Sequence, residues 1–393
     1  MVFRSLELKV NIIHPNLNLC GGGERLSLAT MHAVFKIGAE FDITTYELPD
    51  KKRLQESFGD YFSNIVQKAG SVNILKSALD HHQSASPKQQ KYDVVINTHV
   101  DALPHYLDSY SKIICYCHFP TATAHIESMN EDYLRETRTF NAWESSRGNE
   151  YSMDIKKIYF QRLLESYSKV IENSMVLTNS EFSKKAIYER LGVSAKVLYP
   201  PVETRKFRSV ASSKDRDNII LVLCRIVPYK TVENAISIAK ILKQNKVGEK
   251  MIIIGNMYDD DYITRNYYTE LIKMVKQAQL DEFVTFQINL PLDIVIENMR
   301  KSSIYLHTQA GEHFGMSTVE AMSAGLIPIV PDKGGHAEFV PRKYHFNTIE
   351  KAATIISGAL STPMSERLRM SQLANRFSTE NYLNSLQSIV KSL

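Results

Sequence analysis

The chain has 393 residues, of which 44% are hydrophobic and 23% charged, and its formal net charge at pH 7 is +4. This length exceeds one typical domain and the composition is that of a globular protein, so we expect two α/β domains of nearly equal size and no extensive disorder. The Lys and Arg residues are dispersed and no aromatic-and-basic module accompanies them, which disfavours nucleic-acid binding.

The cysteines and the apolar runs disfavour two further classes of protein. The four cysteines form neither a zinc pattern nor a disulfide framework, which favours a reducing compartment. No apolar run approaches the roughly 18 residues of a membrane-spanning helix, so we expect neither a signal peptide nor a spanning segment. We therefore expect a cytoplasmic protein, with any membrane contact being peripheral and on the cytoplasmic membrane face.

The chain opens with a predicted strand, a glycine loop and a helix. The strand covers residues 8–13, the loop is Gly21-Gly22-Gly23, and the helix covers residues 26–37. This order is typical of the start of a Rossmann-like unit, in which glycines let a ligand approach the backbone closely. A glycine triplet taken alone more often marks only a tight turn.

Residues 51–90 contain an amphipathic stretch with apolar side chains at roughly helical spacing. Most such stripes face a protein core, which is the favoured interpretation here. A peripheral membrane-binding face is the alternative.

Two predicted buried strands, residues 93–96 and 112–117, are each followed by a histidine, His99 and His118. A residue at the carboxyl end of a parallel strand is exposed to the site that such sheets build there. Either histidine taken singly is more often structural. Residues 122–155 are polar with few helix breakers, which predicts a loop or helical insertion.

Pro200 and Pro201 mark the end of the first domain, because two prolines stiffen the exit from a strand and cannot continue a sheet. We predict a first domain over residues 1–210 and a second over residues 211–375. A final helix follows within residues 376–393, with its apolar side chains on one face.

The second domain opens with a strand over residues 218–223, followed by Arg225 and Lys230 just before a predicted helix. Two cations at a strand-to-helix junction suit a diphosphate, which gathers negative charge as a leaving group departs. Surface Lys and Arg residues are, however, usually only solvated. The alternation of strands and helices then continues at 251–254, 263–279, 283–287, 292–300 and 303–306.

Glu312 and Glu320 flank the start of a predicted short helix over residues 316–324, which ends at Gly325 before a buried strand. A helix start carries unpaired N–H groups and partial positive charge, so its first amides form an anion site. Carboxylates repel phosphate, and we therefore expect the two glutamates to accept hydrogen bonds from neutral hydroxyls on either side of it. A nucleotide-sugar has this order of groups; solvated or salt-bridged glutamates are the alternative.

The two glutamates with seven residues between them resemble the E-x7-E signature of retaining glycosyltransferases of family 4. The run from Gly311 to Gly325 is most similar to the eukaryotic α-1,2-mannosyltransferases that extend dolichol-linked oligosaccharide. The resemblance implies an α/β GT-B fold, in which two Rossmann-like domains face a central cleft. The second domain would then hold the nucleotide-sugar and the first the acceptor, with the C-terminal helix packing back on the first domain.

The resemblance also assigns roles to the residues that match the family's motifs. Arg225 and Lys230 match the R-x4-K motif, and His118 matches a histidine that hydrogen-bonds the transferred sugar. The implied catalytic residues are His118, Glu312, Arg225 and Lys230. The implied donor-binding residues are Gly22, Gly23, Arg225, Lys230, Glu312, Phe314, Gly315, Met316, Ser317, Thr318 and Glu320. Lys333-Gly334-Gly335, with Glu338 at the end of the segment, resembles the family's G-G-x-x-E segment.

No cofactor and no metal are expected, because GT-B enzymes generally hold the leaving diphosphate with helix N-termini and cations. We therefore interpret Asp259-Asp260-Asp261 as a solvated loop and not as a D-x-D metal motif.

By resemblance, the chain would move a hexose with retention, most simply mannose from GDP-mannose, onto a glycan or lipid-linked acceptor. Three alternatives stay open: a transferase using a UDP-sugar for cell-surface polysaccharide or glycolipid, a GT-B phosphorylase or epimerase, and a non-catalytic subunit that binds a nucleotide-sugar. The eukaryotic enzymes are anchored in the membrane at their N-terminus, and this chain departs from them because no anchor is expected.

Overall fold

The computed structural model describes residues 8–80, 92–106, 111–139, 153–257 and 262–393. The chain forms two compact units, one made of Met1–Pro201 with Glu380–Leu393 and the other of Val202–Thr379. The sequence had placed the boundaries after residues 210 and 375. The acidic triplet Asp259-Asp260-Asp261 lies outside the described residues, as do parts of the 51–90 and 122–155 regions.

The first unit is built on a seven-stranded parallel sheet in the order β3-β2-β1-β4-β5-β6-β7. The strands are β1 (Lys9–Ile13), β2 (Glu40–Thr45), β3 (Val72–Ile74), β4 (Val94–Asn97), β5 (Lys112–Tyr116), β6 (Ser174–Thr178) and β7 (Lys196–Val197). The strand order reverses between β1 and β4, which makes that pair the topological switch point of the sheet.

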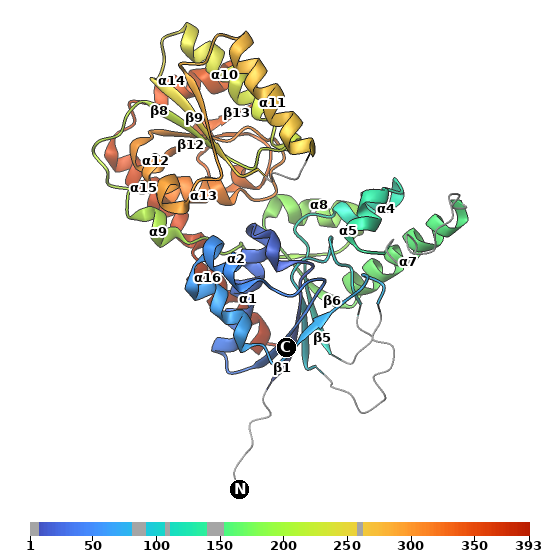
Figure 1. Cartoon of the computed structure of the whole chain (residues 1–393). Coiled ribbons are helices and arrows are strands. Elements are labelled where there is room, and N and C mark those ends of the chain that lie inside the picture. Colours follow the sequence, from blue (N-terminus) through green and yellow to red (C-terminus); the bar gives the residue numbers. More distant parts are fainter. Residues whose placement is uncertain (1–7, 81–91, 107–110, 140–152, 258–261) are drawn as a thin grey trace. The chain divides into compact units, whose positions relative to one another are not determined.

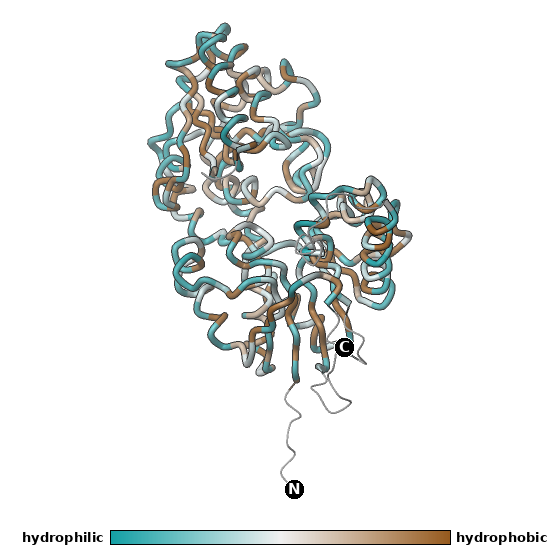
Figure 2. Tube along the Cα trace, turned by 45° about the vertical axis from the view of Figure 1, so that its right-hand side comes forward, coloured by the Kyte–Doolittle hydropathy of each residue, from teal (hydrophilic) through white to brown (hydrophobic). Residues whose placement is uncertain are grey.

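Helices cover both faces of this sheet (Figure 1). On one face lie α1 (Gly22–Lys36), α2 (Lys51–Phe58) and α16 (Thr379–Lys391); on the other lie α4 (Thr121–Glu127), α5 (Glu131–Glu136), α7 (Met153–Glu172) and α8 (Glu181–Leu191). Side chains alternate between the two layers, because successive residues of a strand point to opposite faces. Val94 and Ile96 join the first layer and Val95 the second, and Figure 2 shows the apolar colouring concentrated along these strands.

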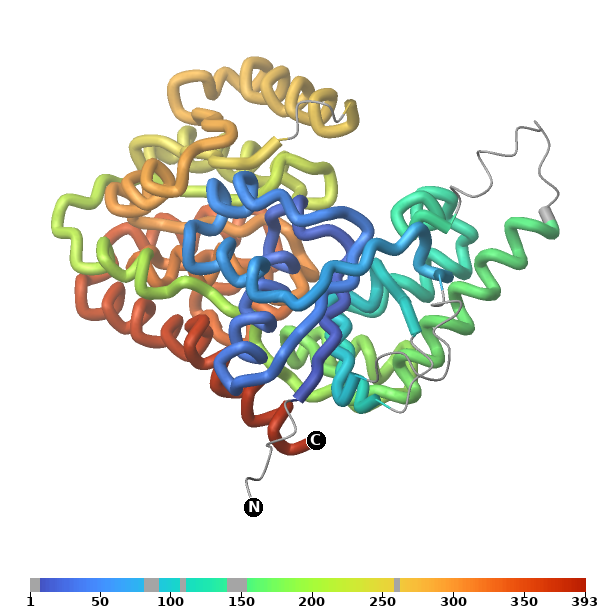
Figure 3. Tube along the Cα trace, turned by 60° about the horizontal axis from the view of Figure 1, so that its bottom comes forward, coloured from blue at the N-terminus to red at the C-terminus, as the bar shows by residue number. Residues whose placement is uncertain are grey.

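The C-terminal helix α16 belongs to the first unit although it ends the chain. Its Tyr382 hydroxyl lies 2.7 Å from the Thr30 hydroxyl of α1, and Leu383 and Leu386 enter the same apolar cluster. Figure 3 shows this last, red segment beside the blue start of the chain. The tail therefore completes one layer of the first unit's core.

The amphipathic 51–90 stretch is broken into short elements. After α2, Gly59 at φ 79° turns the chain into α3 (Asp60–Ser63) and η2 (Asn64–Lys68). Phe58, Phe62 and Ile65 are buried in the core, whereas Tyr61 is 51% exposed. Most of the stripe thus faces the protein interior, as its periodicity indicates.

The second unit is built on a six-stranded sheet in the order β10-β9-β8-β11-β12-β13. The strands are β8 (Ile219–Leu223), β9 (Lys250–Gly255), β10 (Val284–Ile288), β11 (Ile304–Leu306), β12 (Ile327–Pro331) and β13 (His345–Phe346), and all of their pairings are parallel. Here the order reverses between β8 and β11. The predicted α/β fold of two Rossmann-like domains is thereby confirmed.

The helices of the second unit also form two layers (Figure 1). On one side lie α9 (Thr204–Arg208), α12 (Leu292–Lys301), α13 (Met316–Ser323) and α15 (Met364–Ala374); on the other lie α10 (Val232–Gln244), α11 (Tyr262–Gln277) and α14 (Ile349–Ala359). Short 3₁₀ turns complete the unit: η3 (Pro228–Lys230), η4 (Gly335–Glu338), η5 (Arg342–Tyr344) and η6 (Asn375–Phe377); η1 (Leu17–Leu19) lies in the first unit. Within the described ranges, no helix has the length and apolarity that crossing a membrane requires.

Candidate active site

The candidate donor site lies at the switch point of the second sheet. β8 and β11 pair in parallel with Ile220 opposite Ile304, so the loops that follow them leave the same edge side by side. One loop carries Arg225 and Lys230 and the other carries Glu312. Residues far apart in the sequence therefore meet where open α/β sheets bind ligands.

Lys230 and Glu312 form an ion pair in this place. The Lys230 Nζ donates to Glu312 Oε2 at 2.6 Å, and each side chain is 16% exposed. Burial by itself would raise the pKa of Glu312, but the charge and hydrogen bond of Lys230, together with the nearby His307 and His313, outweigh it and the pKa is lowered to about 2. Glu312 is therefore a carboxylate at neutral pH and acts as a hydrogen-bond acceptor.

Two threonines fix the Lys230 loop against the strand that leads to Glu312. The Thr231 hydroxyl donates to the Thr308 carbonyl at 3.1 Å, and the Thr308 hydroxyl donates to the Lys230 carbonyl at 2.8 Å. Thr231 adopts a left-handed conformation at φ 48°, which costs free energy for a β-branched residue and is held by these bonds.

The Gly334-Gly335 pair holds the Glu312 loop from the other side. The Gly335 N–H donates to the Glu312 carbonyl at 2.7 Å, and the Gly311 N–H donates to the Lys333 carbonyl at 2.9 Å. A Cβ on Gly335 would lie 2.1 Å from the carbonyl oxygen of His313, so only glycine fits. The segment resembling G-G-x-x-E thus supports the backbone that carries Glu312.

The first turn of α13 offers backbone donors next to this loop. Its N-cap, Gly315, has φ 98° and gives no side-chain cap, so the first amides are not satisfied by capping. The Thr318 N–H donates to the Gly315 carbonyl at 3.1 Å, which leaves Met316 and Ser317 as the amides placed for an anion. Of the three predicted anion-binding amides, Thr318 instead closes the turn.

Arg225 is exposed, and its guanidinium lies 5.7 Å from the centroid of the Tyr229 ring. The Lys230 ammonium lies 5.9 Å from the same ring, so both cations lie near Tyr229. The ion pair with Glu312 is made by Lys230, whereas Arg225 is turned toward solvent beside it.

The two predicted donor-binding residues Phe314 and Glu320 differ in how far their side chains are buried. Phe314 is 3% exposed and packs against Phe339 and Phe377, with ring centroids 5.4 and 5.3 Å away. Its side chain anchors the loop to the core and does not line the surface. Glu320 is half-buried on the second turn of α13, as its spacing predicts.

The first unit gathers its predicted residues at its own switch point, between β1 and β4. Gly22 and Gly23 begin α1, and His118 follows β5. A Cβ on Gly23 would lie 3.9 Å from His118 Nε2 and 3.5 Å from the His99 ring, so the glycine loop and the histidines are neighbours. The His118 and His99 ring centroids are 4.6 Å apart.

A buried His14–Glu24 pair supports this cluster. Glu24 Oε1 lies 3.1 Å from His14 Nε2, Glu24 Oε2 accepts from the Gly21 N–H at 2.6 Å, and His14 Nδ1 lies 2.9 Å from the Thr98 hydroxyl. The sequence interpretation gave these residues no role. A histidine as the first residue after a switch-point strand is the signal that could have found His14, and the same signal points to His307 after β11.

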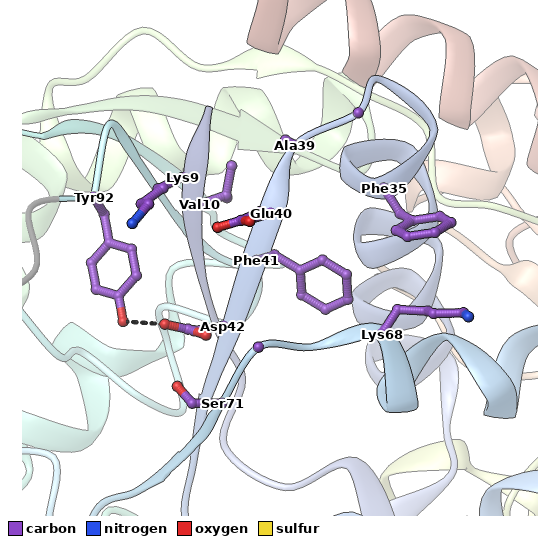
Figure 4. A pocket seen from close by; sticks show the side chains of 12 residues that line it. Lys9, Val10, Phe35, Ala39, Glu40, Phe41, Asp42, Lys68, Ser71 and Tyr92 are labelled. Carbon is purple, nitrogen blue, oxygen red and sulfur yellow. Dashed lines mark hydrogen bonds between the residues drawn. The ribbon is translucent and has the colours of Figure 1, made fainter. Parts of the chain in front are cut away.

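A surface cavity of about 570 Å³ lies elsewhere in the first unit, near the amino ends of β1 and β2 (Figure 4). Lys9, Glu40 and Lys68 line it, and the Tyr92 hydroxyl donates to Asp42 Oδ2 at 2.8 Å. The cavity lies at the amino ends of the strands, whereas His14 and Thr98 lie at their carboxyl ends, and no predicted site residue lines it.

Comparisons with known proteins identify the class of enzyme that this chain resembles. Residues 203–376 match the model of the family described as "Glycosyl transferases group 1". The matched residues make up nearly all of the second unit, and the two parallel α/β sheets are those of the GT-B fold. The resemblance inferred from the E-x7-E spacing is confirmed.

Three curated relatives within this class carry the same enzyme name. The chain is 25% identical over 307 residues to the Dictyostelium discoideum "GDP-Man:Man(3)GlcNAc(2)-PP-Dol alpha-1,2-mannosyltransferase", covering 72% of this chain and 59% of that protein. The Neurospora crassa protein of the same name is 28% identical, with 68% and 54% covered, and the human one is 23% identical, with 98% and 87% covered. The chain thus spans little more than half the length of the first two relatives.

Solved structures agree on the fold. A glycosyltransferase from Rickettsia africae matches with a TM-score of 0.65 at 14% identity, covering 98% of both chains. TarM of S. aureus matches with a TM-score of 0.61 at 11% identity, covering 97% of this chain and 99% of that one.

Proposed function

We propose that this chain is a retaining mannosyltransferase that moves mannose from GDP-mannose onto a lipid-linked oligosaccharide. The observation that carries the proposal is the Lys230–Glu312 ion pair beside the first turn of α13, at the switch point of a group 1 glycosyl transferase domain. The proposed donor and acceptor are those that the names of the relatives give.

In this proposal the second unit binds the donor. Lys230, Arg225 and the Met316 and Ser317 amides hold the diphosphate, whose charge rises as the glycosidic bond breaks. Glu312 accepts hydrogen bonds from hydroxyls of the transferred sugar, and Glu320 accepts from the ribose. The cations stabilise the leaving group, which needs no metal for this step.

In this proposal the anomeric configuration of the sugar is retained because the acceptor attacks by a front-side route. A donor phosphate oxygen takes the proton of the acceptor hydroxyl while that hydroxyl attacks the anomeric carbon from the side of the leaving group. His118 hydrogen-bonds the transferred sugar, and Gly22 and Gly23 allow close approach of substrate to the backbone of the first unit.

Among the described residues no group of three or more His, Cys, Asp or Glu side chains could hold a metal ion.

A lipid-linked acceptor requires contact with a membrane surface. We propose that the first unit makes this contact, with the cytoplasmic face of the membrane. On this unit Leu48 is 67% exposed and Tyr61 is 51% exposed, beside the basic start of α2. Flotation with anionic vesicles tests it: a Lys51→Glu/Lys52→Glu variant should float less than the wild type, and equal flotation would contradict it.

A donor panel tests the proposed function. GDP-, UDP- and ADP-sugars are compared by thermal shift and by transfer to a dolichol-linked oligosaccharide. GDP-mannose should give the largest shift and a product with retained configuration. Transfer only from a UDP-sugar would favour the polysaccharide or glycolipid alternative. Dependence on free phosphate, or product without acceptor, would reveal a phosphorylase or epimerase, and binding without turnover a non-catalytic subunit.

A further inference from the structure

A line of buried side chains connects the first turn of α13 to Glu312. The Ser317 hydroxyl lies 2.8 Å from the Tyr305 hydroxyl, which lies 3.2 Å from His307 Nδ1. On the other side of the same imidazole, His307 Nε2 lies 3.5 Å from Glu312 Oε2. Tyr305 is fully buried and the His307 side chain is 3% exposed.

The geometry decides which ring nitrogen carries the proton. Burial, with His336 and Lys230 nearby, lowers the pKa of His307 to about 3, so the ring is neutral and has one N–H. In the described part of the chain, Nε2 has no hydrogen-bond partner, and the Glu312 carboxylate lies 3.5 Å from it. A lone pair facing that carboxylate would be repelled, so Nε2 holds the hydrogen and Nδ1 accepts from the Tyr305 hydroxyl.

Both neighbours of Glu312 contact the same oxygen. Lys230 Nζ donates to Oε2, and His307 Nε2 faces Oε2 as well. The hydrogen bond from Lys230 and the close electrostatic contact with the His307 ring, both at Oε2, restrict the rotation of the carboxylate and leave the second oxygen, Oε1, for whatever the loop binds.

We infer that His307 is a positioning residue for Glu312, and that Tyr305 fixes the tautomer of His307 and ties it to the first turn of α13. The inference rests on the proposed function, in which Glu312 accepts from the donor sugar. Because Tyr305 contacts both Ser317 and His307, one side chain sets the spacing between the phosphate-binding turn and the sugar-binding carboxylate.

Two substitutions of similar volume separate positioning from packing. His307→Gln keeps an N–H donor near the position of Nε2, whereas His307→Leu removes it. His307→Leu should lower kcat with GDP-mannose roughly 10- to 100-fold, with the affinity for free GDP changing less than about 3-fold. His307→Gln should recover most of this loss. His345→Gln is the matched control, because His345 lies in the same unit and contacts the Val340 carbonyl.

The pH dependence of kcat/KM is a second measurement, and a change in packing alone would not shift it. Lys230, His307 and His313 act on the ionisation of Glu312, and the Glu312 charge in turn acts on His336, Cys224 and Tyr305. Removing the His307 donor should move the acid limb of kcat/KM to higher pH, while His307→Gln keeps it in place. A Leu variant with the wild-type rate and acid limb would overturn the inference, as would a Gln variant no better than Leu.

A spectroscopic test is independent of turnover. The ¹⁵N spectrum of the histidine rings, with His307 assigned by its loss in His307→Gln, should show the Nε2–H tautomer between pH 5 and 8. In Tyr305→Phe this preference should weaken. An Nδ1–H tautomer in the wild type would overturn the inference even in an active enzyme. Absence of transfer from every donor would instead overturn the proposed function, and the spectrum would still decide the tautomer.

Discussion

Thr308 donates its hydroxyl hydrogen to the Lys230 carbonyl at 2.8 Å, although 78 positions separate the two residues in the chain. With the reciprocal bond from Thr231 to the Thr308 carbonyl, this contact joins the two loops at the switch point of the second sheet. The position of the Lys230 ammonium beside Glu312 therefore depends on the adjacency of β8 and β11.

The threonine contacts predict a first variant. Thr308→Val keeps the shape of the side chain but leaves the Lys230 carbonyl without its donor, and the loop should then sample more positions. We expect kcat/KM for GDP-mannose to fall about 10-fold, because misplacement of a positioning loop costs rate. Steady-state kinetics measure it, with Thr354→Val on α14 as the control, since its hydroxyl bonds only its own helix. Equal losses in both variants would contradict the role of Thr308.

A glycine pair in the second unit gives a steric prediction. Gly335→Ala places a Cβ about 2.1 Å from the His313 carbonyl oxygen, so the Glu312 loop must move. We expect loss of GDP-mannose binding by calorimetry. Gly358→Ala is the matched control, because α14 leaves open space there and a helical Gly→Ala change stabilises by roughly 0.5–1 kcal/mol. Donor binding by the Gly335 variant at wild-type affinity would show that the loop does not need this support.

The Glu312 ionisation predicts a pH dependence of stability. Its folded pKa of about 2 lies below the ordinary value of 4.5, so the ion pair stabilises the fold above about pH 4.5 and this contribution is lost as pH falls toward 2. The unfolding temperature of the wild type should therefore fall more steeply over this range than that of Glu312→Gln/Lys230→Met, in which the pair is absent. Parallel curves for the two proteins would place the acid sensitivity in other groups.

His118 predicts a separation of turnover from nucleotide affinity. The ring lies next to Gly23 in the first unit and its Nε2 lies 3.1 Å from the Thr98 carbonyl. His118→Ala should lower turnover with little change in the affinity for free GDP, because the proposed contact is with the transferred sugar. A loss confined to GDP affinity, measured by calorimetry, would assign His118 to the nucleotide instead.

Local signals account for the part of the site that the sequence predicts. Lys230 follows a strand and precedes a helix, and Glu312 precedes a helix that ends at Gly325, so both could be placed at a sheet edge without knowing the tertiary structure. The parallel α/β fold follows from the same alternation. These are relationships within about 20 residues of chain.

The contacts that lock the site depend on tertiary structure and could not be predicted. Thr231 and Thr308 meet only because β8 and β11 are neighbours, and no local pattern states the strand order. Phe314 shows the same dependence, since the side chain of this motif residue turns inward to Phe339 and Phe377, which no local pattern states. His307 directly follows an apolar strand, and this position indicates a site residue only once the strand is known to lie at the switch point of the sheet.

Transfer of radiolabelled mannose from GDP-mannose to a dolichol-linked oligosaccharide, measured for Glu312→Gln and Lys230→Met, tests the central claim most directly. Each change should reduce transfer by about 100-fold or more, measured on protein that circular dichroism shows to be folded at the assay temperature. Glu270→Gln, which removes one partner of the exposed Lys273–Glu270 pair in the same unit, should transfer at the wild-type rate. Wild-type transfer by either the Glu312 or the Lys230 variant would contradict the assignment of this ion pair to the donor site.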